Sequence, residues 1–118
     1  MKFKDSIKTC LLKKYATFSG RATRSEFWFF YLYFIVTAIL ATIIGDLLFG
    51  DYGSFLLWGV AFIHLVPLYS AMCRRLHDTG RSGWWILISL IPYVGQIVLY
   101  AILFLKSDED NKYGSKLE

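Results

Sequence analysis

Cysteine, proline and, over long stretches, basic residues are scarce in this sequence, and each scarcity excludes a class of protein. The two cysteines, Cys10 and Cys73, are too few for a disulfide-stabilised secreted domain and lack the paired spacing of a metal site. We therefore expect both thiols to be reduced and structural. No lysine or arginine lies between Arg24 and Arg74, and none lies within residues 82–105. Apolar runs of this length without cationic side chains indicate membrane segments.

Motifs for catalysis, phosphate binding and metal binding are missing as well. The chain contains no nucleophile elbow, phosphate-binding loop, HExxH helix or clustered Cys and His residues. His77 and Asp78 resemble an acid–base pair, but adjacent side chains point in different directions, and Asp78 opens a turn-forming sequence with Gly80. We therefore predict a protein that is not an enzyme, holds no cofactor or metal and does not bind nucleic acid.

Apolar and aromatic side chains are what the sequence has in excess. Of its 118 residues, 56% are hydrophobic and 19% are aromatic, which is too apolar for an ordinary soluble chain. The formal net charge is +4, and seven of the thirteen lysines and arginines precede residue 25. We predict one all-α membrane domain over residues 1–118, because helices satisfy their own backbone groups in lipid. Its parts are an amphipathic cytoplasmic segment (1–20), a helical membrane core (21–105) and a flexible polar tail (106–118).

The N-terminal segment has the periodicity of a helix with one apolar stripe. The stripe consists of Phe3, Ile7, Cys10, Leu11, Tyr15 and Phe18. With lysines mostly on the other face, this pattern predicts an amphipathic helix lying at the membrane interface. A partly ordered basic leader is the alternative.

The first membrane span is predicted over residues 27–44. Thr23 and Glu26 match a capping box, which marks the start of a helix. The following eighteen residues carry no charge and would rise roughly 27 Å as a helix, close to a hydrocarbon thickness of about 30 Å. Aromatic residues crowd the first half of this run, as they do at membrane interfaces.

A second span is predicted over residues 54–73. It follows a short turn that contains two acids and no basic residue, so the turn is expected on the non-cytoplasmic side. Pro67 lies within this span and is expected to kink it and to free the carbonyl of Ile63.

A third span is predicted over residues 84–105, although Pro92 and Gly95 interrupt this apolar run. The alternative is a re-entrant hairpin that turns at these two residues. Charge favours the hairpin, since it would leave no basic residue outside. Each limb is, however, too short to cross a bilayer of roughly 30 Å, and lipid-exposed backbone would need protein cover. We therefore expect three spans.

Orientation follows from the distribution of basic residues. The segment before the first span is rich in lysine and arginine and the first loop has neither, so the N-terminus is predicted to be cytoplasmic. The first two spans are antiparallel, and the third begins where the second ends. All five arginines should therefore meet at one membrane face.

This face is the candidate site. Its predicted members are Arg21, Arg24, Glu26, Arg74, Arg75, His77, Asp78 and Arg81. One interpretation is a topology signal with an internal salt-bridge network, in which the two acids pair with Arg75, Arg81 or Arg24. The others are binding of anionic lipid head groups, and binding of a protein or another anionic ligand.

His64 is the one titratable side chain expected at mid-bilayer depth, which makes it a candidate for proton or ion handling. A neutral histidine bonded to a neighbouring helix is the other interpretation. The function predicted overall is a non-enzymatic membrane component that binds anionic lipid, a membrane-protein partner or further copies of itself. The alternative is a small transporter or channel subunit that acts as an oligomer.

Four motifs follow one another along the chain: Phe18-x-Gly20-Arg21-x-x-Arg24-Ser25-Glu26-Phe27-Trp28, Arg74-Arg75-Leu76-His77-Asp78-Thr79-Gly80-Arg81-Ser82-Gly83-Trp84-Trp85, Ile91-Pro92-x-x-Gly95 and Asn111-Lys112-Tyr113-Gly114. From Tyr15 onward the chain thereby resembles the small bacterial membrane proteins known as domain of unknown function 805. The resemblance implies a multi-pass protein of the bacterial inner membrane and brings no established activity. One departure is Ser107-Asp108-Glu109-Asp110, which stands where a proline- and glycine-rich lead-in is expected.

Overall fold

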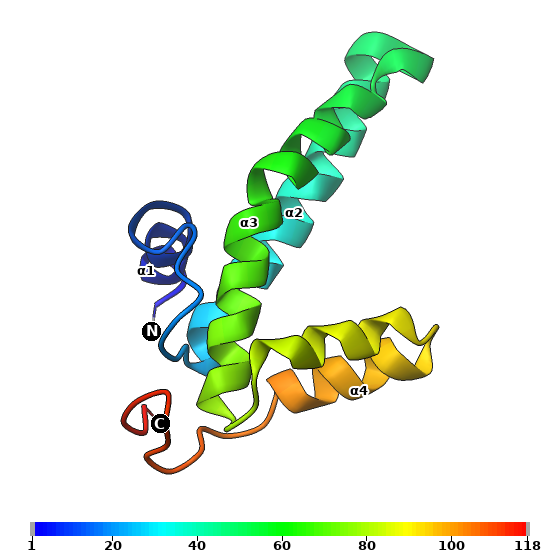
Figure 1. Ribbon diagram of the computed structural model, residues 1–118. Helices are drawn as coiled ribbons and strands as arrows, with labels where there is room; N and C mark the ends of the chain where they lie inside the picture. Colours follow the sequence, from blue (N-terminus) through cyan, green and yellow to red (C-terminus); the bar gives the residue numbers. More distant parts are fainter. Residues whose placement is uncertain (1, 118) are drawn as a thin grey trace.

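Within residues 2–117, which the computed structural model describes, every regular element is helical (Figure 1). In chain order these are α1 (Phe3–Lys8), the π-helical turn η1 (Thr9–Lys13), α2 (Arg24–Phe49), the 3-10 turn η2 (Gly50–Tyr52), α3 (Ser54–Asp78), the 3-10 helix η3 (Gly83–Leu90) and α4 (Val94–Leu103). The described residues contain no β-strand, only an isolated bridge between Asn111 and Gly114. The predicted all-α fold is confirmed.

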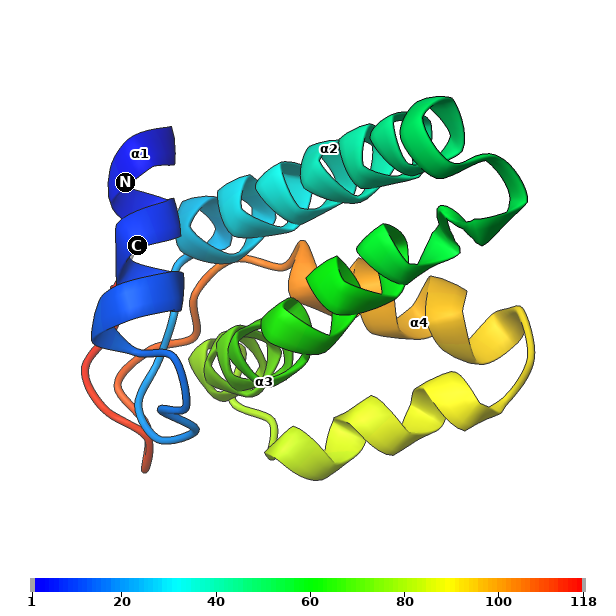
Figure 2. The ribbon, with the colours of Figure 1, turned by 90° about the horizontal axis from the view of Figure 1, so that it is seen from above.

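Helices α2 and α3 form a long antiparallel pair, and the shorter η3–α4 hairpin branches from one end of it (Figures 1 and 2). Both termini lie at this end, which we call the basic end because it contains all five arginines. By length and composition, α2 with η2 and α3 are the two described helices that can cross a membrane. They contain the predicted spans 27–44 and 54–73, and both extend past them at the basic end.

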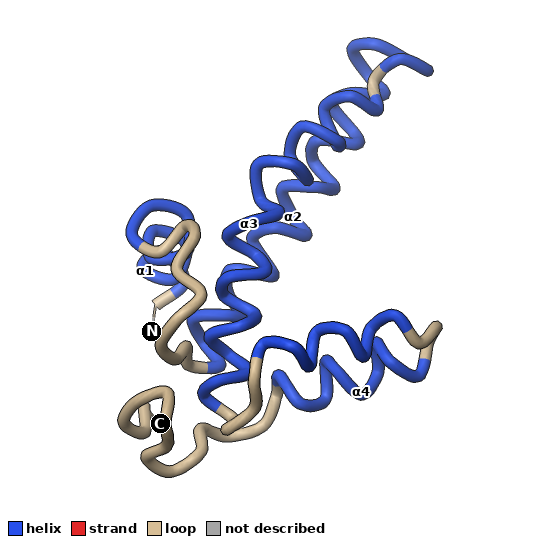
Figure 3. Tube along the Cα trace, in the orientation of Figure 1, coloured by secondary structure: helices blue, strands red, loops and turns tan. Residues whose placement is uncertain are grey.

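The continuous helix predicted over residues 84–105 is wrong. η3 and α4 are separate helices, and the chain reverses direction in the loop between them (Figure 3). Pro92 has no amide hydrogen to continue a helix, and Tyr93 has a positive φ of 62°. A Cβ at Gly95 would lie 1.9 Å from the carbonyl oxygen of Ile88, so a glycine is needed where the limbs meet. The three-span count is therefore not confirmed.

The N-terminal helix is shorter than its apolar stripe. The helical conformation ends at Lys13, five residues before Phe18. Ser6 and Cys10 are its buried residues, and the Ser6 hydroxyl donates to the carbonyl of Glu26. The segment thus packs its polar Ser6 against the start of α2, a contact that the apolar pattern did not predict.

The segment after η1 docks on α3 at its proline. Pro67 lacks the amide that would bond the carbonyl of Ile63, and the Tyr15 hydroxyl donates to that oxygen at 2.6 Å. Ser70 adds a second link, because its hydroxyl lies 3.0 Å from the carbonyl oxygen of Tyr15. The carbonyl that the sequence predicted to be free thus becomes an attachment point.

At the opposite end of the long pair, two glycines bring α2 and α3 into backbone contact. A Cβ at Gly45 would lie 2.3 Å from the carbonyl oxygen of Gly53, and a Cβ at Gly53 would lie 2.1 Å from that of Gly45. Any larger residue would drive its Cβ into the backbone of the opposing segment. The two predicted spans can therefore approach this closely at the turn only because both positions are glycine.

We expect Gly45→Ala to lower the free energy of unfolding by about 1–3 kcal/mol, because its methyl group can be accommodated only by moving the helices apart. Thermal unfolding in detergent, followed by far-UV circular dichroism, measures the change. Gly59→Ala is the matched control, since a Cβ there has no atom within 4 Å, and alanine in a helix interior should stabilise by up to about 1 kcal/mol. Equal effects at both positions would contradict the proposed steric contact.

Candidate functional site

The basic end contains a buried cluster of charged side chains, which we call the arginine cluster. Its members are Arg21, Glu26, Arg74, Arg75 and Asp78. Arg21 comes from the loop before α2 and Glu26 from the first turn of α2, while the other three come from the last turns of α3. All five are at least nine-tenths buried, although charged side chains are almost never buried unless they are paired.

Arg74 joins α3 to α2 and to the N-terminal segment. Its guanidinium forms an ion pair with Glu26, and its Nε donates to the carbonyl of Thr17 at 3.1 Å. The remaining nitrogen faces the Cys10 sulfur at 3.9 Å. The backbone amide of Glu26 donates to the Thr23 hydroxyl, so the Thr23 half of the predicted capping box forms. The Glu26 carboxylate pairs with Arg74.

Arg75 joins α3 to the end of α4. It forms an ion pair with Asp78 and donates to the carbonyls of Leu103, at 2.9 Å, and Leu105. Carbonyls at the end of a helix lack partners within the helix and carry partial negative charge, so a guanidinium is well suited to them. A further bond to the carbonyl of Ala22 adds the loop before α2.

Arg21 joins the same aspartate to the C-terminal tail. Its Nε donates to Asp78 at 2.7 Å. Its four remaining N–H groups point to four carbonyl oxygens, those of Asp78, Asp108, Glu109 and Gly114. Ser107 also donates to the Asp78 carboxylate, and the amide of Asp108 donates to the backbone carbonyl of Asp78. The tail predicted to be flexible is thus held against the arginine cluster from residue 107 to residue 114.

The arginine cluster has a formal charge of +1, since it contains three guanidinium groups and two carboxylates. The guanidinium N–H groups that do not face a carboxylate mostly donate to backbone carbonyls. Among the described residues, no buried side-chain nitrogen or oxygen lacks a hydrogen-bond partner. The donors of these three arginines therefore face inward, toward the protein's own acceptors.

The remaining predicted members lie at the edge of the arginine cluster. Arg81 is half-buried, donates to the carbonyl of Thr79 and lies 5.7 Å above the ring of Trp85. Arg24 is half-buried in the first turn of α2. Of the ion pairs anticipated from the sequence, the structure contains Arg75 with Asp78, and it adds the pairs made by Arg74 and Arg21.

His77 and Asp78 do not form an acid–base pair. The carboxylate faces Arg21 and Arg75, whereas Nδ1 of His77 lies 2.9 Å from the carbonyl oxygen of Gly20. The imidazole also stacks on Tyr113, with ring centroids 4.0 Å apart and planes parallel within 1°. His77 thus links α3 to the loop before α2 and to the tail.

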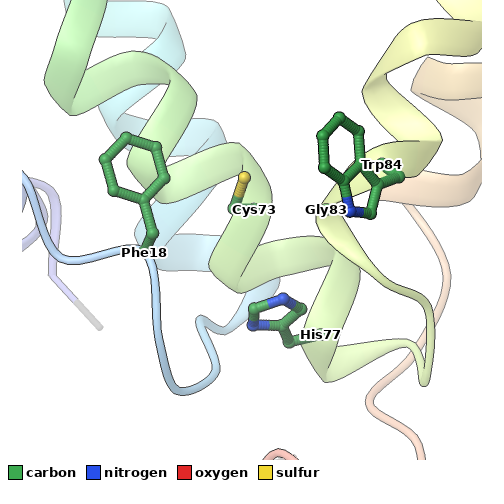
Figure 4. Close-up of a pocket in the computed structure, with 5 residues that line it drawn as sticks. All are labelled: Phe18, Cys73, His77, Gly83 and Trp84. Atoms are coloured by element: carbon green, nitrogen blue, oxygen red, sulfur yellow. The ribbon is translucent and has the colours of Figure 1, made fainter.

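A pocket of about 330 Å³ lies beside the arginine cluster (Figure 4). Phe18 and Trp84 flank it, and Cys73 and His77 project into it from α3. A thiol and an imidazole alone make a poor metal site, and residues 2–117 contain no group of three or more His, Cys, Asp or Glu suited to a metal ion. The other cysteine, Cys10, lies outside this pocket. Burial and the nearby Glu26 raise the pKa of its thiol to about 11, so little reactive thiolate forms at neutral pH.

His64 lies buried between α2 and α3, far from the arginine cluster along α3. Its Nδ1 is 2.7 Å from the carbonyl oxygen of Val60, and its Nε2 is 3.0 Å from the Tyr33 hydroxyl. Because a carbonyl only accepts, Nδ1 donates to Val60, and the Tyr33 hydroxyl is the partner of Nε2. Both ring nitrogens therefore have partners within the α2–α3 pair.

The cations that face outward at the basic end are mainly lysines. Four of them lie on α1, on η1 and just before α1, namely Lys2, Lys4, Lys8 and Lys13. Three more follow α4, namely Lys106, Lys112 and Lys116. The opposite end carries the exposed acids Asp46 and Asp51.

A family model described as "Protein of unknown function (DUF805)" matches residues 15–115. The chain belongs to this family. It is 36% identical over 108 residues to the inner membrane protein YhaI of Escherichia coli (strain K12), with 89% of each chain covered. It is also 36% identical over 94 residues to the inner membrane protein YhaH of the same strain, covering 75% of this chain and 76% of the relative. No solved structure matches.

The resemblance predicted from the four motifs is thereby confirmed. The DUF805 match includes the whole arginine cluster, the η3–α4 hairpin and the bound part of the tail. It begins after η1, so the lysine-bearing segment lies outside it.

Proposed function

We propose that this chain is a non-enzymatic, multi-pass component of the bacterial inner membrane, with a cytoplasmic N-terminus, that binds anionic lipid head groups at its basic end. The observation that carries the proposal is the separation of charge along the α2–α3 pair. All lysines and arginines lie at one end, together with some acids, whereas the opposite end carries the exposed acids Asp46 and Asp51 and no basic residue. That separation matches the tendency of basic residues to stay on the cytoplasmic side, where the leaflet is anionic.

The buried arginines and the exposed lysines of the basic end have different roles. Arg21, Arg74 and Arg75 hold the fold together, because their donors face internal acceptors. Four lysines of the N-terminal segment, Lys2, Lys4, Lys8 and Lys13, face solvent, together with the exposed apolar side chains Phe3 and Leu12. Basic groups beside apolar ones suit a surface made of anionic head groups over hydrocarbon.

The alternative of a transporter or channel subunit draws on His64. Both ring nitrogens of this residue have partners within the α2–α3 pair. Residues 27–45 of α2 and 54–77 of α3 contain no aspartate or glutamate that could form a proton relay with it, so lipid binding is the function with more support.

The test uses the full-length protein in phosphatidylcholine vesicles that contain a small fraction of spin-labelled phosphatidylglycerol. We expect replacement of Lys2, Lys4, Lys8 and Lys13 by glutamine to lower the preference for the anionic lipid at least about tenfold, since each basic group near such a surface contributes about 1 kcal/mol. Lys112→Gln with Lys116→Gln removes two outward-facing charges from the tail at the same end, and the loss per charge removed is compared between the two variants. An unchanged preference in the fourfold variant would overturn the proposal, and an equal loss per charge in the tail variant would show that the tail shares in the binding.

A further inference from the structure

We infer that the η3–α4 hairpin inserts into the hydrocarbon of the leaflet at the basic end, turns within it and returns, so that both termini lie on the same side of the membrane. This inference goes beyond the proposed function, because it concerns acyl chains instead of head groups. The hairpin is the part of the chain for which a third span was predicted.

The first argument is the surface of the hairpin. No charged residue lies between Arg81 and Lys106. Both limbs and the turn expose large apolar side chains, among them Leu90 at 77%, Ile97 at 70% and Val94 at 62%. A continuous apolar surface of this kind requires a cover.

The second argument is length. The eight residues of η3 rise about 16 Å at roughly 2.0 Å each, and the ten residues of α4 rise about 15 Å at 1.5 Å each. Half of a hydrocarbon core of about 30 Å is about 15 Å. The two limbs therefore match each other and the depth of one leaflet, and neither can cross the bilayer.

The third argument concerns the backbone, which must be satisfied without water. At the turn the amides of Ile91 and Gly95 donate to the carbonyls of Ile88, at 3.1 Å, and Ile91, at 3.0 Å. The side-chain amide of Gln96 donates to the carbonyl of Ser89 at 3.1 Å, and Pro92 has no amide hydrogen to satisfy. Several backbone groups of the turn thus find partners within the hairpin, which lowers the cost of placing the turn in hydrocarbon.

The fourth argument is the attachment of its base. Trp28 of α2 donates to the carbonyl of Leu103 at 3.1 Å and stacks on Phe104 with ring centroids 4.0 Å apart. Arg75 holds the same carbonyl, and the tail beyond it is bonded to Arg21. Since these contacts tie residues 103–114 to the ends of α2 and α3, the tail lies on the side where α2 begins.

Acyl chains are the occupant that fits these observations best. The limbs are long enough to reach the middle of the bilayer and too short to cross it, the exposed side chains of the turn are apolar or aromatic, and every basic residue stays at the base. Figure 1 shows the turn pointing away from the α2–α3 pair, so the pair leaves the apolar tip uncovered.

The test places reporters and single cysteines in the full-length protein. With a dual alkaline phosphatase and β-galactosidase reporter at either terminus, we expect the cytoplasmic signal from both. In a Cys10→Ser, Cys73→Ser background, we expect Lys106→Cys to react with an impermeant maleimide from the cytoplasmic side only, and Leu90→Cys to react at least tenfold more slowly from either side. A periplasmic C-terminus, or periplasmic labelling of Leu90→Cys, would overturn the inference in favour of a full span.

A second measurement separates lipid from a second copy as the cover of the tip. A fluorophore on Leu90→Cys, attached in detergent before reconstitution, should be quenched by lipids carrying a nitroxide on the acyl chain. Absence of quenching, or efficient disulfide cross-linking between Leu90→Cys chains, would overturn the assignment of acyl chains. Loss of head-group preference in the lysine variants leaves both readouts unchanged, so the inference and the proposed function can fail separately.

Discussion

Replacing Asp78 by asparagine is expected to lower the free energy of unfolding by about 3–5 kcal/mol, because removal of one partner leaves buried charges uncompensated. The Asp78 carboxylate serves two guanidinium groups, those of Arg21 and Arg75, and all three side chains are buried. It also accepts from Ser107, which attaches the tail. Asparagine keeps the volume and removes the charge, so the effect reports electrostatics and not a cavity. Chemical unfolding in detergent, followed by far-UV circular dichroism, measures it.

The matched control is the exposed ion pair of Glu109 with Lys116, whose N–O distance is 3.0 Å. Its side chains are 83% and 40% exposed, so water screens the pair and Glu109→Gln should change stability little. Asp78→Asn combined with Arg21→Gln should recover part of the loss, since the double variant has the formal charge of the original arginine cluster. If Asp78→Asn is as mild as the control, the arginine cluster does not hold the fold.

Much of the fold is predictable because charge and hydropathy vary over long stretches of the sequence. The charge-free run 27–44 and the nearly charge-free run 54–73 correspond to helices with the length and apolarity to cross a membrane. A short first loop makes the two helices antiparallel, which is why all five arginines were expected at one end. The reversal after η3 is harder to predict, because a pattern of apolar residues does not show whether a short hairpin can satisfy its own backbone. That depends on Gln96 reaching Ser89 and on the close approach at Gly95.

The sequence places the five members of the arginine cluster at one end of the molecule, but it says less about which of them pair. Arg75 and Asp78 are three residues apart on one helix, which places them side by side. The pairing of Arg74 with Glu26 depends on how α2 and α3 are rotated about their axes, and that rotation is set by packing. The carbonyl acceptors of Arg21 and Arg75 were missed entirely, since every residue has a carbonyl and no sequence pattern singles one out. The sequence offers one indication of these acceptors. Three buried arginines have more N–H donors than two carboxylates can accept, so further acceptors are needed.

Glu26→Gln is expected to destabilise the protein by a similar amount, about 3–5 kcal/mol, by leaving the buried Arg74 without its carboxylate. A second effect acts in the same direction. Glu26 lies in the first turn of α2, where the helix dipole favours a negative charge and an unpaired guanidinium would face the positive end. Cys10 lies against both residues, and its thiol is buried in the original protein. In the variant, the N-terminal segment should detach and the thiol should become reactive toward maleimide at neutral pH.

Asp46→Asn is the matched control on the same helix. Asp46 is exposed in the last turn of α2, where a negative charge opposes the dipole, so its removal should leave stability unchanged or raise it by a few tenths of a kcal/mol. The exchanged pair, Glu26→Arg with Arg74→Glu, separates the two effects in the argument. It restores the opposite charges but places the cation at the positive end of α2, so its stability should stay below that of the original pair. Full recovery in the exchanged variant would show that the ion pair alone matters and that the helix dipole contributes nothing at this position.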